Sequence, residues 1–130
     1  MAFDAKFTIN GTTYDALKAG YRMMRDVDSK GCPSSHVYGV EIWGTVESTD
    51  DTNIIESMFN EYKPFSGGIT FKKGNEDAKM KEFKFEKAYV IGFEESFERK
   101  NETPMTIDFK ITAQKVDCNG ATHEEEWPEK

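Results

Sequence analysis

The fold is decided by residues 46–65, which read VESTDDTNIIESMFNEYKPF. Apolar side chains in this stretch recur at spacings of one, three and four residues, which places them on one stripe of a helix with about 3.6 residues per turn. The side chains on this stripe are Ile54, Ile55, Met58, Phe59 and Tyr62. We therefore expect one short helix whose apolar face packs against a sheet.

The ends of this helix also have sequence signals. Ser48 and Asp51 form an S-x-x-D pattern, in which a side-chain oxygen can accept a hydrogen bond from a free amide of the first turn. Acidic residues are also favoured there, at the positive end of the helix dipole. Pro64 ends the segment, because the residue before a proline is disfavoured in the α region. Ser48 and Asp51 are thus the expected helix start.

The rest of the chain alternates between apolar and polar residues, as half-buried strands do. Asn10-Gly11 is a strong signal for a tight hairpin, and Lys87 interrupts an apolar row, which indicates a bulge. Residues 15–20 are ambiguous. The expected strands are 3–9, 12–14, 21–27, 36–47, 69–71, 80–97 and 105–114.

These elements predict a mainly β protein, an antiparallel barrel or two-sheet sandwich with one short flanking helix. We expect one domain over residues 1–120, because Asn119-Gly120 follows the last clear strand. Residues 121–130 read ATHEEEWPEK and are expected to form a loose acidic tail.

Composition excludes several classes of protein. The 130 residues include 17 Lys and Arg against 24 Asp and Glu, a net charge of -7, which argues against a nucleic-acid partner. No apolar run is long enough to insert into a membrane. The N-terminal MAFDAKFTI lacks the pattern of a secretory signal, so we expect synthesis in the cytoplasm. Cys32 and Cys118 lack metal-type spacing and are expected to be unpaired thiols.

Residues suited to catalysis are scarce. Neither His36 nor His123 lies in a recognisable nucleophile motif, and no glycine-rich phosphate loop is present. His123 stands beside three glutamates, but a terminal acidic run is ordinarily solvated, so we assign no metal site there. The sequence therefore predicts no catalytic residue, no cofactor and no bound metal, and the protein is not expected to be an enzyme.

Two features have open interpretations. Residues 28–35 form a polar loop, longer than a tight hairpin needs, which is either functional or a flexible connection. Trp43 lies among charged residues on the face that alternation assigns to solvent. It is either an interface or ligand residue, or a residue that the helix or a loop covers.

Several segments together resemble the Hcp (TssD) tube proteins of type VI secretion systems, over nearly the whole chain. The most specific are VESTDD at 46–51 and PMTIDFKI at 104–111. The opening MAFDAKFTINGTTYDAL, the loop GCPSSHVYG at 31–39 and HEEEW at 123–127 fit the same pattern.

The resemblance implies a split β-barrel whose copies form hexameric rings, and rings that stack into a hollow tube. It implies as partners further copies of the chain, the sheath, spike and baseplate proteins, and effector proteins carried in the lumen. It also implies cytoplasmic assembly and secretion through the type VI system without a signal peptide. The family joins its rings through an extended loop between early strands. Here that loop holds Asp28, Lys30, Gly31, Pro33 and Ser34. Of these, Asp28, Lys30 and Ser34 are expected to contact the next ring.

Ring formation requires one surface patch to meet a different patch on the next copy. A strand that carries both apolar and polar residues on each of its faces suits such a contact, because a second partner can then cover its outer face. On this basis the candidates for the ring interface are Arg22, Met24, Trp43 and Thr45.

Two alternatives remain open at this point. One is a monomeric ligand-binding β-barrel in the manner of a lipocalin, with a cavity lined by the aromatic row from Phe83 to Phe97. The other is the tail-tube protein of a related phage-like contractile particle, which would share the fold and the mechanics.

Overall fold

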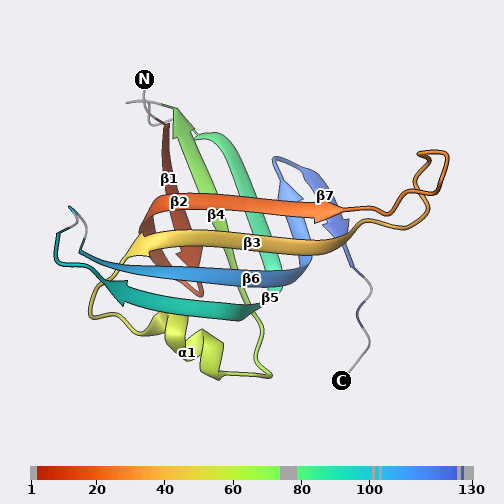
Figure 1. Cartoon of the computed structure of the whole chain (residues 1–130). Helices are drawn as coiled ribbons and strands as arrows, with labels where there is room; N and C mark the ends of the chain where they lie inside the picture. Colours follow the sequence, from red (N-terminus) through yellow and green to blue (C-terminus); the bar gives the residue numbers. More distant parts are fainter. Residues whose placement is uncertain (1–2, 74–78, 101, 103, 126, 128–130) are drawn as a thin grey trace.

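The computed structural model describes residues 3–73, 79–100, 102, 104–125 and 127 of the chain. Over these residues it contains seven strands and one short helix (Figure 1). No helix in this part is long and apolar enough to cross a membrane. The elements are β1 (Phe3–Ile9), β2 (Thr12–Met24), β3 (Tyr38–Glu47), α1 (Asn53–Phe59), β4 (Phe65–Lys73), β5 (Lys79–Phe97), β6 (Met105–Cys118) and β7 (Ala121–Glu124).

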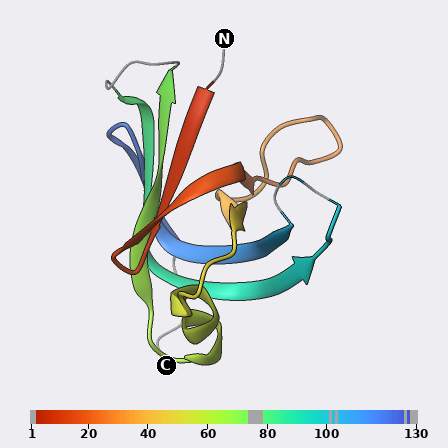
Figure 2. The ribbon, with the colours of Figure 1, turned by 90° about the vertical axis from the view of Figure 1, so that its left-hand side faces the viewer.

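The strands form one antiparallel sheet in the order β3-β2-β1-β4-β5-β6-β7, and β3 also pairs with β6. The sheet therefore closes on itself, and Figure 2 shows it curling around a central core. The long strands β5 and β6 each contribute to two walls. The front wall consists of β2, β3 and the adjoining halves of β5 and β6; the back wall consists of β1, β4, β7 and the other halves. The predicted fold class, a mainly β antiparallel split barrel with one helix, is confirmed.

The core consists of the inward-facing residues of both walls. Phe7 and Phe109 meet edge to face, with ring centroids 4.9 Å apart, and Phe83 and Phe85 are each 1% exposed. Burial of one such side chain contributes roughly 1.5–3 kcal/mol to folding. Aromatic and aliphatic side chains thus fill the barrel interior together, with Ile42, Ile69 and Ile111 fully buried beside the aromatic rings.

The bulge predicted near Lys87 is confirmed. Lys87 has a φ of 52°, and the inward-facing residues change from Phe83 and Phe85 before it to Ala88 and Val90 after it. The aromatic row is interrupted on the inward side: Ile91 is 52% exposed, and Phe93 is partly buried against the core after a second register shift. A continuous aromatic lining from Phe83 to Phe97, which the ligand-binding alternative needs, is therefore absent from this described strand.

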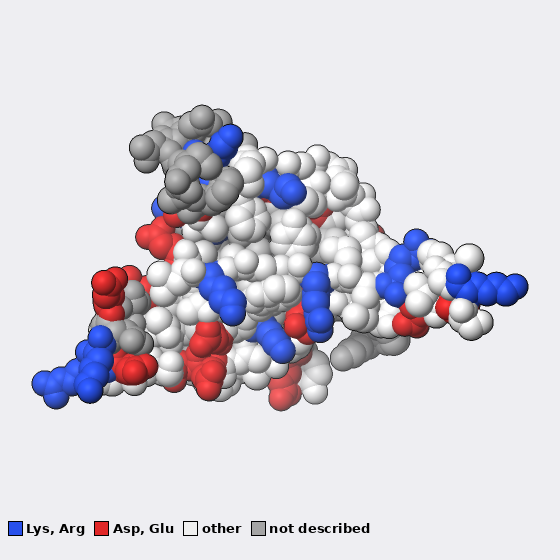
Figure 3. Space-filling view, turned by 45° about the horizontal axis from the view of Figure 1, so that its top comes forward, with Lys and Arg blue, Asp and Glu red and all other residues white. Residues whose placement is uncertain are grey.

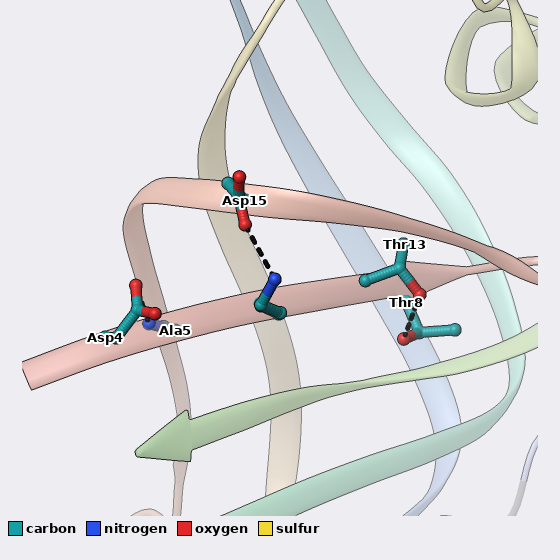
Figure 4. Close-up of polar contacts among 6 residues, drawn as sticks. Asp4, Ala5, Thr8, Thr13 and Asp15 are labelled. Atoms are coloured by element: carbon teal, nitrogen blue, oxygen red, sulfur yellow. Dashed lines mark hydrogen bonds and ion pairs between the residues drawn. The ribbon is translucent and has the colours of Figure 1, made fainter. Parts of the chain in front are cut away.

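The hairpin between β1 and β2 turns at Asn10-Gly11, where both residues have positive φ, 49° and 90°. This conformation matches the twist of the flanking strands. On the outward side, Lys6 forms an ion pair of 3.1 Å with Asp15 across the hairpin, and Thr8 and Thr13 share a hydrogen bond (Figure 4). The predicted hairpin is thus confirmed, and its second strand runs without a break through the ambiguous residues 15–20.

The expectation that order ends at Asn119-Gly120 is wrong. These two residues have φ values of 51° and 98° and form a second hairpin of the same kind, after which β7 pairs with β6. Beyond β7, Glu125 and Trp127 also pack on the barrel, whereas Glu126 and residues 128–130 of the expected tail lie outside the described residues. An Asn-Gly turn returns a strand to the sheet, so the last clear strand was not the end of the domain.

The helix is shorter than predicted, because α1 spans only Asn53–Phe59 and residues 46–47 belong to β3. Ser48 does not cap it: the Ser48 hydroxyl donates to the Glu95 carboxylate instead. Thr52 occupies the N-cap position without a side-chain capping hydrogen bond. Asp51 does lie at the helix start, where its carboxylate accepts a hydrogen bond of 3.3 Å from the Asn53 amide.

The packing face of the helix is narrower than expected. Ile54 is buried, Met58 packs on the core, and Ile55 is half-buried. Phe59 and Tyr62 are instead 71% and 80% exposed, so their assignment to the apolar stripe is wrong. The reason is that the helix ends at Phe59 and covers only one end of the barrel beside β5 (Figures 1 and 2).

Candidate assembly surfaces

Residues 25–37, between β2 and β3, project from one end of the front wall (Figure 1). We call this segment the projecting loop. It is a small hairpin rather than a flexible connection, because Val27 and Pro33 form a β-bridge. The Asp28 amide donates to the Cys32 carbonyl at 2.8 Å, and the Ser34 amide donates to the Asp26 carbonyl at 2.8 Å.

The tip of the projecting loop is organised by Asp28. One carboxylate oxygen of Asp28 accepts the backbone amides of Lys30 and Cys32, at 2.9 and 3.0 Å. The Gly31 amide donates to the Asp28 carbonyl at 3.0 Å, and Gly31 has a φ of 88°, which glycine adopts without strain. The predicted contact residue Asp28 therefore points into its own loop, while the side chain of Lys30 remains exposed.

The base of the loop is fixed by side chains. The Tyr38 hydroxyl donates to the Asp26 carboxylate at 2.6 Å, the Asp26 amide donates to the Ser35 hydroxyl at 2.7 Å, and Arg25 Nε donates to the Ser35 carbonyl at 3.1 Å. The hydrogen bond to Asp26 raises the pKa of Tyr38. These contacts preorganise the loop, which lowers the entropic cost of docking it on a partner.

The outward side of the front wall, which we call the front face, is shallow and polar. Two cross-strand rows run over it, Gly20–Trp43–Lys110–Gly92 and Lys18–Thr45–Asp108–Glu94. The Trp43 ring lies over Gly20, where a methyl group would come within 2.4 Å of it. A depression of about 300 Å³ lies beside Trp43. Trp43 is thus half-buried on this face, without cover from the helix.

Charges of both signs alternate over the front face. One carboxylate oxygen of Glu41 lies 3.8 Å from Arg22 Nε and 3.8 Å from Lys110 Nζ. The Thr45 hydroxyl donates a hydrogen bond to the Asp108 carboxylate. Figure 3 shows basic and acidic side chains interspersed across the middle of the molecule and at both projecting ends. Such a surface has no single sign, and it fits contact with a mixed protein surface better than contact with a polyanion.

Two strands of the front wall have open edges. In the described pairings, β2 beyond Asp15 bonds only to β3, and β5 beyond Ala88 bonds only to β6. Unpaired strand edges invite pairing with another chain. Arg22 and Met24 both lie on this edge strand, β2. Met24 is paired with Tyr38 after a register shift, and it is 44% exposed. The structure thus brings Arg22, Trp43 and Thr45 to one face and places Met24 beside the base of the projecting loop.

The segment after β7 closes the split between β3 and β7, a feature that the sequence reading missed. The buried Val40 has left the β3–β6 ladder, and its amide donates to the Glu125 carboxylate at 3.4 Å. Glu125 and Gln114 exchange two further hydrogen bonds of 2.7 and 2.9 Å. Trp127 donates to Glu125 at 3.1 Å and packs near Tyr89. We call Glu125 and Trp127 the C-terminal latch.

Both cysteines are free. Cys32 is exposed in the projecting loop, and Cys118 is half-buried, 3.5 Å from the Tyr21 hydroxyl. The pKa of Tyr21 is raised to about 12, mainly by burial and to a smaller extent by the hydrogen bond with Cys118. The Tyr21 ring stacks on the Phe83 ring, with the two ring centroids 3.8 Å apart. Tyr21 and Cys118 are therefore part of the packing of the barrel.

The described residues contain no group of three or more His, Cys, Asp and Glu placed to hold a metal. A depression of about 570 Å³ on the back wall is lined mainly by Gly, Ser, Thr and mixed charges such as Lys84 and Glu86. The described part of the chain is thus a small split β-barrel with a projecting loop and two open strand edges.

Comparison with known proteins identifies the family. The model of the family described as hemolysin coregulated protein Hcp (TssD) matches residues 1–128. Hcp1 from Flavobacterium johnsoniae is 32% identical, with a TM-score of 0.86 over 93% of this chain and 98% of that one. The chain belongs to the Hcp (TssD) family, the secreted tube proteins of type VI secretion systems.

More distant structures share the fold. Hcp1 from Salmonella typhimurium is 12% identical, with a TM-score of 0.69 over 94% of this chain and 91% of that one. The secreted protein Hcp3 from Pseudomonas aeruginosa is 9% identical, with a TM-score of 0.63 over 98% and 100%. No curated protein sequence matches the chain.

Membership of the family establishes the broad function. Hcp proteins are structural proteins, not enzymes, and they build the hexameric rings of the secreted tube. This sets aside the monomeric ligand-binding barrel and the phage tail-tube protein as alternatives.

Proposed function

We propose that six copies of this chain close into a ring, and that the rings stack head to tail into the hollow inner tube of a type VI secretion system. The observation that carries this proposal is the projecting loop. It is ordered by its own hydrogen bonds, it reaches beyond the barrel, and the described hydrogen bonds of its tip all stay within the loop. An ordered projection of this kind fits a contact with another molecule.

Stacking is the role we assign to the tip residues Lys30, Gly31, Pro33 and Ser34. Asp28 acts through them, because its carboxylate holds the amides of Lys30 and Cys32. The loop therefore has a contact part and a supporting part. A substitution in either part is expected to weaken stacking.

Ring closure is the role we assign to the open edge of β2. Arg22 and Met24 lie on this strand, and Trp43 and Thr45 lie next to it on β3. A ring contact joins two different patches on neighbouring copies, so an edge on one side of the subunit needs a different surface on the other side. The open edge of β5 is in a suitable place for that second surface.

The assembled tube implies the remaining partners. We propose that a contractile sheath surrounds the tube, that a spike tips it, that a baseplate starts it, and that effector proteins travel in its lumen. Assembly would take place in the cytoplasm, and the subunit would leave the cell with the tube. This role needs no cofactor, no nucleic acid and no direct insertion into a membrane.

The test replaces residues 27–34 by a two-residue Asn-Gly turn and examines the purified protein by negative-stain electron microscopy and sedimentation. Rings of normal diameter that no longer form tubes are the expected result. Tubes that form at the same protein concentration as those of the unmodified chain would contradict the proposal. Ser29→Ala is the matched control, because Ser29 is exposed in the same loop and forms none of the loop's described side-chain hydrogen bonds.

A further inference from the structure

The end of the barrel opposite the projecting loop carries an exposed apolar pair. Figure 1 shows the loop at one end of the front wall and the β5–β6 connection at the other. Phe97 and Met105 face each other directly across β5 and β6 there, and they are 66% and 43% exposed. Adjacent apolar side chains of this exposure indicate a contact surface.

An acidic residue lies in the segment next to this pair. The Ser48 amide donates to the Met105 carbonyl at 2.9 Å, so the connection from β3 to α1 lies beside the apolar pair. This connection also carries the exposed Asp50. Within the described chain, the carboxylate of Asp50 has no ion pair or hydrogen bond. We call Asp50, Phe97 and Met105 the acceptor patch.

The projecting loop offers the complementary chemistry. The carboxylates of Asp26 and Asp28 are occupied by hydrogen bonds inside the loop. The ammonium group of Lys30 at the tip has no partner among the described residues, and Val27 is 64% exposed. At the tip of the loop, Lys30 is thus a cation without a described partner, and Val27 is an exposed apolar side chain close to it in the sequence. The acceptor patch presents the carboxylate of Asp50 beside two exposed apolar side chains.

We propose that the acceptor patch of one copy receives the projecting loop of a copy in the next ring. Lys30 then lies against Asp50, and Val27 packs on Phe97 and Met105. The inference rests on the proposed function, because it assumes that the loop joins rings. A head-to-tail stack uses two different surfaces at opposite ends of the subunit, and such a contact propagates without limit. The positions of the loop and of the patch satisfy this condition (Figure 1).

Charge reversal with rescue tests the proposal. Lys30→Glu and Asp50→Lys, each alone, are expected to raise the concentration of rings needed for stacking by about tenfold or more, because like charges then face each other. Phe97→Ala is expected to act in the same direction. The combined variant Lys30→Glu with Asp50→Lys restores opposite charges and should recover stacking. Ring formation, measured by sedimentation of each variant, should remain unchanged.

Glu61→Lys is the control for Asp50→Lys, because Glu61 is an exposed acid in the α1–β4 connection and the change in net charge is the same. Normal stacking by both Asp50→Lys and Phe97→Ala would overturn the proposal. A combined variant that stacks no better than the single variants would also overturn it. These failures are distinct from failure of the proposed function, which would appear as tubes formed by the chain with the truncated loop.

Discussion

The Tyr14 hydroxyl, near the start of β2, donates a hydrogen bond to the Asp51 carboxylate, which lies just before α1. A second contact lies beside it, because the Asn53 side-chain amide donates to the Ile9 carbonyl at 2.6 Å. The start of the helix is therefore attached to the β1–β2 hairpin. The acidic residues that resemble a helix cap in the sequence serve in part to attach the helix to the sheet.

This relationship predicts a loss of stability at alkaline pH. The pKa of Tyr14 is raised to about 12, mainly by burial and to a smaller extent by the hydrogen bond to Asp51. Tyrosine in an unfolded chain has a pKa of about 10. The stabilisation is complete below about pH 10 and is lost as the pH rises toward 12, because the unfolded chain releases this proton more easily. Urea unfolding at several pH values measures the effect.

Tyr14→Phe should make that alkaline slope shallower, with the part due to Tyr21 remaining, and should cost about 1 kcal/mol at neutral pH through loss of the hydrogen bond. Tyr62→Phe is the control, because Tyr62 is 80% exposed. An alkaline slope that is the same in Tyr14→Phe as in the unmodified chain would show that Tyr14 does not cause it.

The C-terminal latch predicts a cost for losing one carboxylate. Glu125→Ala leaves the amide of the buried Val40 without its partner and should lower the free energy of unfolding by about 1–3 kcal/mol. Glu124→Ala removes only an exposed ion pair of 3.9 Å with Lys87 and should cost less than about 1 kcal/mol. Equal effects of the two substitutions in urea unfolding would contradict the role of the latch.

Close packing under β3 predicts that Gly44 cannot be enlarged. A methyl group at Gly44 would lie 2.4 Å from the Phe7 ring and 3.0 Å from Phe109, so Gly44→Ala should cost about 1–3 kcal/mol through overpacking. At Gly92 the nearest atom would be at 3.4 Å, an ordinary contact, so Gly92→Ala is the control. Thermal unfolding compares the two, and a Gly44→Ala variant as stable as the Gly92→Ala variant would refute the packing argument.

The support of the loop tip by Asp28 predicts an indirect effect on stacking. Asp28→Ala releases the amides of Lys30 and Cys32, so the tip should become mobile while the barrel keeps its stability. Amide hydrogen exchange should be faster in residues 28–33 and unchanged in β3. Exchange that stays slow in the loop would show that its backbone bonds alone maintain the tip.

Much of the fold follows from the sequence, because alternation and turn chemistry are local signals. The hairpin at Asn10-Gly11 and the bulge at Lys87 follow from such signals, whereas the expectation that Asn119-Gly120 ends the domain is wrong, because the chain returns there as β7. The length of the helix does not follow from the sequence pattern. The Ser48 hydroxyl forms a hydrogen bond with the Glu95 carboxylate instead of capping the helix, and Phe59 is exposed to solvent. A periodic apolar pattern alone cannot distinguish a side chain that packs from one beyond the edge of the sheet.

The assembly surfaces are predictable in location but not in detail. The polar loop after β2 is visible in the sequence, but the inward turn of Asp28 depends on the conformation of the loop. The bond between Glu125 and the Val40 amide joins residues 85 positions apart, so no local pattern predicts it. The same holds for the acceptor patch, which forms only because β3 and β5 end beside the start of β6.

Cryo-electron microscopy of the purified, tag-free protein will show whether the chain forms open rings that stack through the projecting loop. Six-fold rings with an open centre are expected, together with stacks in which the loop of one ring contacts the next. Monomers alone across the micromolar range, or stacks in which the loop touches no neighbouring ring, would be incompatible with this assembly.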